Sequence, residues 1–297
     1  MNKGIWYAIG AYAWWGFFPI YWKMLKHVPA LQLIGHRIVW SFAALIVIII
    51  IIRQWKEFRN SVYNFKILRI YTLAALLIAI NWFMYVWAVN AGHIVETSLG
   101  YFINPLLSVL MGVIFFHERL RLWQWIPIGF AAAGVLYLTL ALGSLPWIAL
   151  ILAFSFASYG VVKKIAPLSS LHGLTLETFI LLIPAAVFLI YSDYSGTGSF
   201  THNGWLTDLM IVGAGVITTI PLLMFASAAK RIPLSFVGIL QYIAPTLQFL
   251  IGVLLYKEQF SFGQFIGYSF VWTALIIFGL NSFSSYREKT ISSAEME

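Results

Sequence analysis

Long apolar runs with few charged residues follow one another along the whole chain. A helix that crosses a membrane needs about 20 residues of this kind. We count ten such runs, at about 4–22, 31–52, 68–89, 94–116, 122–141, 145–162, 172–191, 205–228, 233–256 and 261–283. Only 9% of the 297 residues are charged, against roughly 25% in an average soluble domain. The pattern predicts an all-α integral membrane protein with ten transmembrane helices.

Lysine and arginine residues gather in alternate connections between the runs. Fourteen lie on the side that holds both termini, whereas only Lys23, Lys26 and Lys257 lie on the other side. Positive residues are retained on the cytoplasmic side, so we predict that both termini are cytoplasmic and that 192–204 faces outward. This membrane pattern also accounts for the net charge of +8, so no nucleic-acid partner is expected.

A shift of 140 residues aligns 102–126 with 242–266 without gaps. Nine of the 25 positions are identical, and they include a Pro, a Gly, a Glu and a Gln. Apolar composition alone does not readily place those four residue types in one register. The alignment therefore indicates an internal repeat.

The repeat predicts the domain organisation. We expect a first five-helix repeat at 1–142, a second at 143–284, and a polar cytoplasmic tail at 285–297. An odd number of helices turns the second copy upside down, and inverted repeats are typical of secondary transporters. A structural duplication without a role in transport is the alternative.

Four segments carry a family resemblance. They are HRIVWS at 36–41, SLGYFINPL at 98–106, FSFASYG at 154–160 and QYIAPTL at 241–247. With the two five-helix halves, they resemble the RarD branch of the EamA family, in the drug/metabolite transporter superfamily. The resemblance implies a multi-pass permease of the bacterial inner (plasma) membrane that exports a small organic metabolite or drug-like solute by alternating access. The solute and the lipid bilayer are its expected partners, and both a monomer and a homodimer stay open.

A proline lies near the middle of the fourth run and of the ninth. Pro105 and Pro245 each remove a backbone hydrogen bond, which would free the carbonyls of Tyr101 and Gln241. Paired interruptions of this kind indicate a solute site near the membrane midplane, with a plain packing kink as the alternative.

Aromatic and uncharged polar side chains surround these prolines. Such a lining suits a solute with an apolar body and a few hydrogen-bonding groups. For the tryptophans, an interfacial anchor is the alternative. The expected substrate-binding residues are Trp15, Asn81, Trp82, Tyr85, Tyr101, Asn104, Gln241 and Tyr242.

Ionisable residues inside membrane spans are rare and usually functional. We expect Arg37 and Glu96 to form an ion pair that gates the outer mouth. Glu177 lies deeper in its run, where it could pair with Lys163 or Lys164, or carry the coupling proton of a proton-driven transporter. Static ion pairing is the alternative for all of them.

Two further glutamates, Glu118 and Glu258, end equivalent runs of the two halves. Each stands a few residues before the next run. A carboxylate there can accept hydrogen bonds from free N–H groups at the start of the following helix. We predict that both are structural caps.

Motifs of other function classes are missing from the sequence. It contains no phosphate-binding glycine-rich loop with its lysine, no H-E-x-x-H, no G-x-S-x-G and no cysteine. We therefore expect no catalytic residue, no metal and no cofactor. A membrane-embedded enzyme or a lipid-handling protein is the alternative, and the central prolines without a charged ring disfavour a channel.

Overall fold

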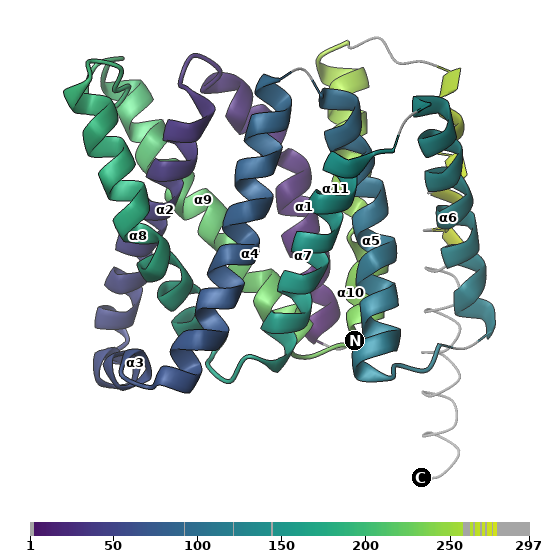
Figure 1. The fold of residues 1–297 in the computed structure, drawn as a ribbon, viewed down its shortest axis with the longest axis horizontal. Helices are drawn as coiled ribbons and strands as arrows, with labels where there is room; N and C mark the ends of the chain where they lie inside the picture. The colour runs from purple at the N-terminus through teal and green to yellow at the C-terminus, as the bar shows by residue number, and fades with distance from the viewer. Residues whose placement is uncertain are drawn as a thin grey trace.

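The computed structural model describes residues 3–277, except 92, 121, 144, 258–261, 264, 268, 271 and 275. Within this part the chain is helical and holds no strand (Figure 1). The helices are α1 (Lys3–Met24), α2 (Ala30–Ile51), α3 (Trp55–Val62), α4 (Phe65–Asn90), α5 (Ile94–Phe116), α6 (Leu122–Leu142), α7 (Trp147–Ile165), α8 (Ser170–Tyr194), α9 (Trp205–Ala229), α10 (Leu234–Leu240) and α11 (Ile243–Leu250), followed by the π-helical turn η1 (Ile251–Leu255).

Seven described segments are long and apolar enough to cross a membrane. They are Ala30–Ile51, Phe65–Val89, Leu99–Phe116, Trp147–Ile165, Ser170–Tyr194, Trp205–Ala229 and Leu234–Leu255. The predicted all-helical membrane fold is confirmed, whereas the count of ten spans is not. The other three predicted runs fall on α1, on α6 and on 262–277. Helix α1 has 22 residues, but many are tryptophan and tyrosine, and α6 contributes only the shorter apolar stretch Gln124–Tyr137.

The basic connection after α2, which lies between two of the predicted runs, contains the short helix α3. Its side chains divide by polarity, because Phe58 and Ser61 are buried while Lys56 and Arg59 are exposed. Phe58 packs into a small core with Tyr71 of α4 and Leu176 of α8. Burial of this one apolar edge explains why the segment is helical and lies against the bundle.

The strongest helix contacts join the two halves of the chain. Helix α2 packs against α8 and α9, α5 against α7 and α10, α1 against α9 and α11, and α4 against α7 and α8. Glycines allow the closest crossings, as in many membrane bundles. A Cβ atom at Gly215 of α9 would lie only 2.5 Å from Trp40 Cβ of α2, and Ser41 Oγ donates to the Gly215 carbonyl at 2.8 Å. The halves therefore interleave.

The two ends of the bundle differ in charge. The start of α1 and helix α3 lie at one end, and the connection between α8 and α9 lies at the opposite end (Figure 1). Lys163 and Lys164 stand in the last turn of α7, near the first of these ends. We call the end that holds α3 and the start of α1 the basic end, and the opposite end the 195–204 end.

Candidate solute-binding cavity

A cavity of about 300 Å³ lies among α1, α2, α4, α5, α7, α9 and α11. Pockets for small molecules commonly measure about 300–1,000 Å³. Along α1 the lining runs from Tyr12, near the middle of the helix, to Trp22, close to its end. The cavity therefore occupies the half of the bundle on the 195–204 end. Tyr85 and Tyr101 on its wall are 38% and 39% exposed.

Seven of the eight residues predicted to bind substrate line this cavity. They are Trp15, Asn81, Trp82, Tyr85, Tyr101, Asn104 and Gln241. Asn81 and Tyr85 are four residues apart, and Tyr101 and Asn104 are three apart, so each pair shares one face of its helix. Contact of these side chains with a solute stays a prediction.

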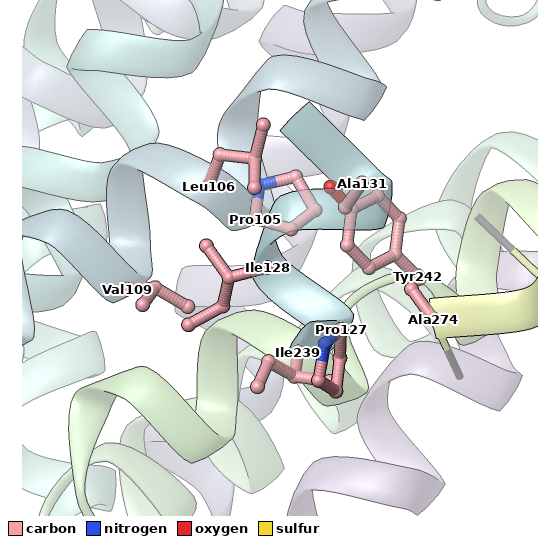
Figure 2. Close-up of a pocket in the computed structure, with 9 residues that line it drawn as sticks. All are labelled: Pro105, Leu106, Val109, Pro127, Ile128, Ala131, Ile239, Tyr242 and Ala274. Carbon is pink, nitrogen blue, oxygen red and sulfur yellow. The ribbon is translucent and has the colours of Figure 1, made fainter. Parts of the chain in front are cut away.

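Tyr242 and Pro105 lie behind the cavity wall. The buried Tyr242 hydroxyl donates to the Phe102 carbonyl at 3.0 Å. Both residues line a separate void of about 10 Å³ between α5, α6 and Ala274 (Figure 2). A void of that size holds at most a single water. The structure therefore gives Tyr242 and Pro105 a role in helix packing.

The helix interruption predicted at both prolines occurs at one of them. Helix α5 runs through Pro105 unbroken, whereas α10 and α11 are separated at Gln241 and Tyr242. Pro245 has no N–H to bond the Gln241 carbonyl, and the N–H of Ala244 takes this place at 3.2 Å. The Gln241 carbonyl therefore already has one partner within the chain, and its contact with a solute stays a prediction. Its side chain and Pro245 still line the cavity.

Aromatic rings form one wall of the cavity. The ring centroids of Trp15 and Tyr12 are 5.6 Å apart, and those of Trp15 and Phe156 are 5.9 Å apart. The sequence pattern indicated Trp15 but neither Tyr12 nor Phe156. Helical spacing could have found Tyr12, because it lies three residues before Trp15 on the same face.

The amide groups on the wall divide into two kinds. Asn81 Nδ2 donates to the Leu152 carbonyl at 2.8 Å, and Gln248 Nε2 donates to the Trp15 carbonyl at 3.1 Å. These two amides tie neighbouring helices together. By contrast, the buried Asn104 Oδ1 and Tyr12 hydroxyl have no hydrogen-bond partner among the described residues. Buried polar atoms are normally satisfied, so these two atoms would gain a partner if the wall shifts to expose them to a solute.

Arg37 is the one charged residue in the described lining of the cavity. It lies two turns inside α2, deeper than the predicted position at the start of the helix. Its Nε donates to Thr218 Oγ1 of α9 at 2.9 Å. The guanidinium carbon lies 5.0 Å from the Trp22 ring centroid and 4.7 Å from that of Trp82. These contacts hold the positive charge inside the cavity wall.

Glu177 is buried with a cation and a hydroxyl. Lys163 Nζ lies 2.6 Å from Glu177 Oε1, and the Tyr159 hydroxyl donates to Oε2 at 2.9 Å. Of the two lysines considered from sequence, the structure pairs Glu177 with Lys163. This cluster lies outside the cavity lining, between α7 and α8.

Glu118 links helices that are distant in the sequence, at the basic end of the bundle. Its carboxylate accepts from the backbone N–H groups of Leu234 and Ser235 at 2.7 and 2.9 Å, and from Ser235 Oγ at 2.7 Å. Lys164 Nζ lies 3.4 Å from the same carboxylate. Glu118 therefore caps α10, not the following helix α6 as predicted from sequence.

Two predicted residues cannot be placed in this geometry. The Glu96 side chain and Glu258 lie outside the described residues. The Arg37–Glu96 gate and the cap by Glu258 stay predictions. Among the described residues, no carboxylate lies within ion-pair distance of Arg37.

The fold and its cavity define a class of protein: a multi-span helical membrane protein with a small-molecule-sized pocket between its halves. Comparison with known proteins narrows the class. The sequence model of the EamA-like transporter family matches residues 2–140 and, a second time, residues 145–280. The chain belongs to the EamA-like transporter family.

Several relatives match over almost their full length. Uncharacterized transporter YojE of Bacillus subtilis (strain 168) is 45% identical over 295 residues, which cover 98% of this chain and 97% of that protein. Protein RarD of Escherichia coli (strain K12) is 40% identical over 286 residues, which cover 96% and 97%. Chloramphenicol-sensitive protein RarD of Pseudomonas aeruginosa is 29% identical over 287 residues, which cover 95% of each chain. The resemblance to RarD proteins is thereby confirmed.

A solved structure described as "Crystal structure of protein" shares the fold. The TM-score is 0.68 at 18% sequence identity, over 92% of this chain and 96% of that one. At this identity the likeness concerns the fold alone.

Proposed function

We propose that this chain is a secondary active transporter that moves a small organic solute across a bacterial inner membrane by alternating access. The observation that carries the proposal is the position of the cavity. It lies between the two halves of the chain and on the 195–204 end, while the Glu118 network joins α5, α7 and α10 at the basic end. Alternating access requires a solute site between the halves that opens to one face at a time, and a cavity nearer one end of the bundle with a polar network at the other supports this mechanism.

We also propose that the chain consists of two inverted five-helix repeats, 1–142 and 143–284, with a cytoplasmic tail at 285–297. Under this proposal α1, α2, α4 and α5 correspond to α7, α8, α9 and α10–α11. The packing of α1 on α9 then corresponds to that of α7 on α4, and the packing of α5 on α7 corresponds to that of α11 on α1. All four contacts are present. The two separate matches to one family model support the same division.

The basic end is proposed to be cytoplasmic. The N-terminus, α3 and the lysines at the end of α7 share that end, and Lys and Arg are enriched in cytoplasmic connections. The outward end would then be the 195–204 end, and the described state would be open to the outside. Export is the direction that the family resemblance implies, and proton coupling is the form of energy coupling to test first.

Flux through reconstituted protein tests the proposal. Liposomes would be loaded with a small-molecule extract of bacterial cells, and the solutes inside and outside would be followed by mass spectrometry. We expect a subset of solutes to cross faster than in protein-free liposomes, with their masses unchanged. Flux equal to that of protein-free liposomes contradicts transport. Appearance of a solute of altered mass favours the membrane-embedded enzyme or lipid-handling alternative.

A further inference from the structure

Among the described residues, the charge balance of the cavity lining is uneven. Arg37 contributes a positive charge, and the described residues of the lining contribute no carboxylate. Two described glutamates of the bundle are engaged elsewhere, Glu177 with Lys163 and Glu118 at the start of α10, and Glu57 is exposed on α3. A charged side chain at membrane depth is expensive, and such residues commonly serve an ion or substrate pathway. A negative charge on the solute would offset the free-energy cost of holding the Arg37 charge at this depth.

The orientation of Arg37 leaves the two terminal nitrogens of its guanidinium group available for hydrogen bonds. A guanidinium carries five N–H donors. Nε uses its one donor on Thr218 Oγ1, and the four donors of the two terminal nitrogens have no partner among the described residues. These four donors form the planar fork that binds a carboxylate or a phosphate in a bidentate manner.

The surroundings of Arg37 hold the fork in place. The guanidinium packs against the rings of Trp22 and Trp82, contacts that stabilise a cation without neutralising its charge. Thr218 adds an uncharged acceptor from the other half of the chain. Arg37 is thus positioned by both halves, so an anion bound to it would contact the interface that has to move during transport.

The aromatic wall supplies the second half of a recognition site. Tyr12, Trp15 and Phe156 form a ring cluster on the same cavity. An apolar or aromatic body would pack on these rings while an acidic group contacts Arg37. A solute with both features would fill the cavity and place a negative charge beside Arg37.

We propose that the solute is an organic anion, with a carboxylate or comparable acidic group bound by Arg37 and an apolar or aromatic body held by the ring cluster. This inference deepens the proposed function, on which it rests. It concerns binding, and a binding experiment can therefore fail independently of the flux experiment described above.

Three small probes of nearly equal shape and different charge test the proposal. They are 3-phenylpropionate, the neutral 3-phenylpropionamide and the cationic phenethylamine. Binding to the purified full-length protein would be measured by quenching of tryptophan fluorescence, because Trp15, Trp22 and Trp82 line the cavity, and by thermal stabilisation. A hydrogen bond to a charged partner is worth enough to make the acid bind about 10-fold more tightly than the amide, or better, and the amine should bind most weakly.

Variants of Arg37 assign the preference to this residue. Arg37→Gln should abolish the preference for the acid, and Arg37→Lys should keep only part of it, because a lysine lacks the fork. Lys23→Gln is the matched control, since Lys23 stands near the end of α1 over the Tyr256 ring and outside the described lining. That variant should keep the full preference.

Two outcomes overturn the inference. One is equal binding of the acid and the amide to the unmodified protein, a comparison that does not depend on any variant. The other is a preference for the acid that survives in folded Arg37→Gln. Should Arg37→Gln fail to fold, Thr218→Val keeps the charge but removes the acceptor that orients it, and we expect this variant to lose several-fold in affinity for the acid alone.

Discussion

Lys163 Nζ lies 2.6 Å from Glu177 Oε1, and these side chains are only 1% and 2% exposed. The Tyr159 hydroxyl occupies the second carboxylate oxygen. The pair joins α7 to α8 near the basic end. Because Glu177 is satisfied on both oxygens, we interpret it as part of a static cluster that holds the helices together, the alternative already considered for this residue from sequence.

Removal of one partner of this pair should be strongly destabilising. Lys163→Met or Glu177→Gln leaves the other group buried without its partner, and such a change costs about 3–5 kcal/mol. The double variant Lys163→Met with Glu177→Leu should lose less than either single change, because no charge remains buried. Thermal unfolding of the purified protein measures the effect, with the exposed Lys56→Met as control. Proton-driven flux that disappears in a stably folded Glu177→Gln variant would instead make Glu177 a coupling residue.

The cap of α10 by Glu118 predicts a local change in backbone dynamics. Loss of an N-terminal cap costs about 0.5–2 kcal/mol, so Glu118→Ala should raise amide hydrogen exchange at the start of α10 by roughly 2- to 30-fold. The measurement is hydrogen exchange of peptides that contain Leu234 and Ser235, whose N–H groups bond the carboxylate. Peptides from α9 are the internal control. Unchanged exchange in the α10 peptides would show that Glu118 does not hold this end closed.

The orientation in the membrane can be tested with single cysteines, since the chain contains none. Tyr194 at the end of α8 is 92% exposed and Tyr63 after α3 is 82% exposed. A membrane-impermeant thiol reagent should label Tyr194→Cys in intact cells. It should label Tyr63→Cys only after permeabilisation. The reverse pattern would place the basic end outside and contradict the proposed topology.

The Arg37–Glu96 gate gives a prediction of its own. If the two residues pair when the cavity is empty, Arg37→Gln and Glu96→Gln should each lower transport or folded yield, and the double variant should recover part of the loss. The same pairing means that Glu96 competes with a bound anion, so Glu96→Gln should tighten the binding of 3-phenylpropionate. Strictly additive losses in the double variant would show that the side chains do not meet.

Contact with the solute should depend on Asn104 more than on Tyr242. Asn104→Ala removes an unpartnered oxygen on the cavity wall, and Gln241→Ala shortens a lining side chain. Each should lower the affinity for a transported solute several-fold, because one lost hydrogen bond is worth on the order of 1 kcal/mol. Tyr242→Phe should lower stability and leave affinity unchanged, since its hydroxyl bonds Phe102 behind the wall. Affinities for the solute identified by flux, measured on folded variants, decide between these outcomes.

The sequence was most informative where local spacing determines position. Apolar runs predicted the helical membrane fold, and seven of the eight residues expected to surround the two prolines line one cavity. Neighbouring residues on a helix point about 100° apart. Adjacent residues can still both line a cavity, as Asn81 and Trp82 do. The sequence alone therefore could not show that Gln241 faces the cavity and Tyr242 does not.

Local sequence patterns could not predict contacts between segments that are distant in the chain. The N–H groups that Glu118 accepts from lie 116 and 117 residues away, so the sequence around Glu118 indicated a cap but named the wrong helix. The partner of Arg37 on α9 is 181 residues distant. Such contacts follow from the way the halves interleave, which no spacing within one run predicts.

Access to Ala244 from the two sides of the membrane tests the central claim most directly. Ala244 is a small lining residue of the cavity, next to Pro245. In oriented vesicles of the Ala244→Cys variant, an impermeant thiol reagent should react from either side, and 3-phenylpropionate should slow both reactions. This is the result expected of one solute site that opens alternately to each face. Reaction from one side only, or reaction from both sides that a bound solute does not slow, would contradict alternating access through this cavity.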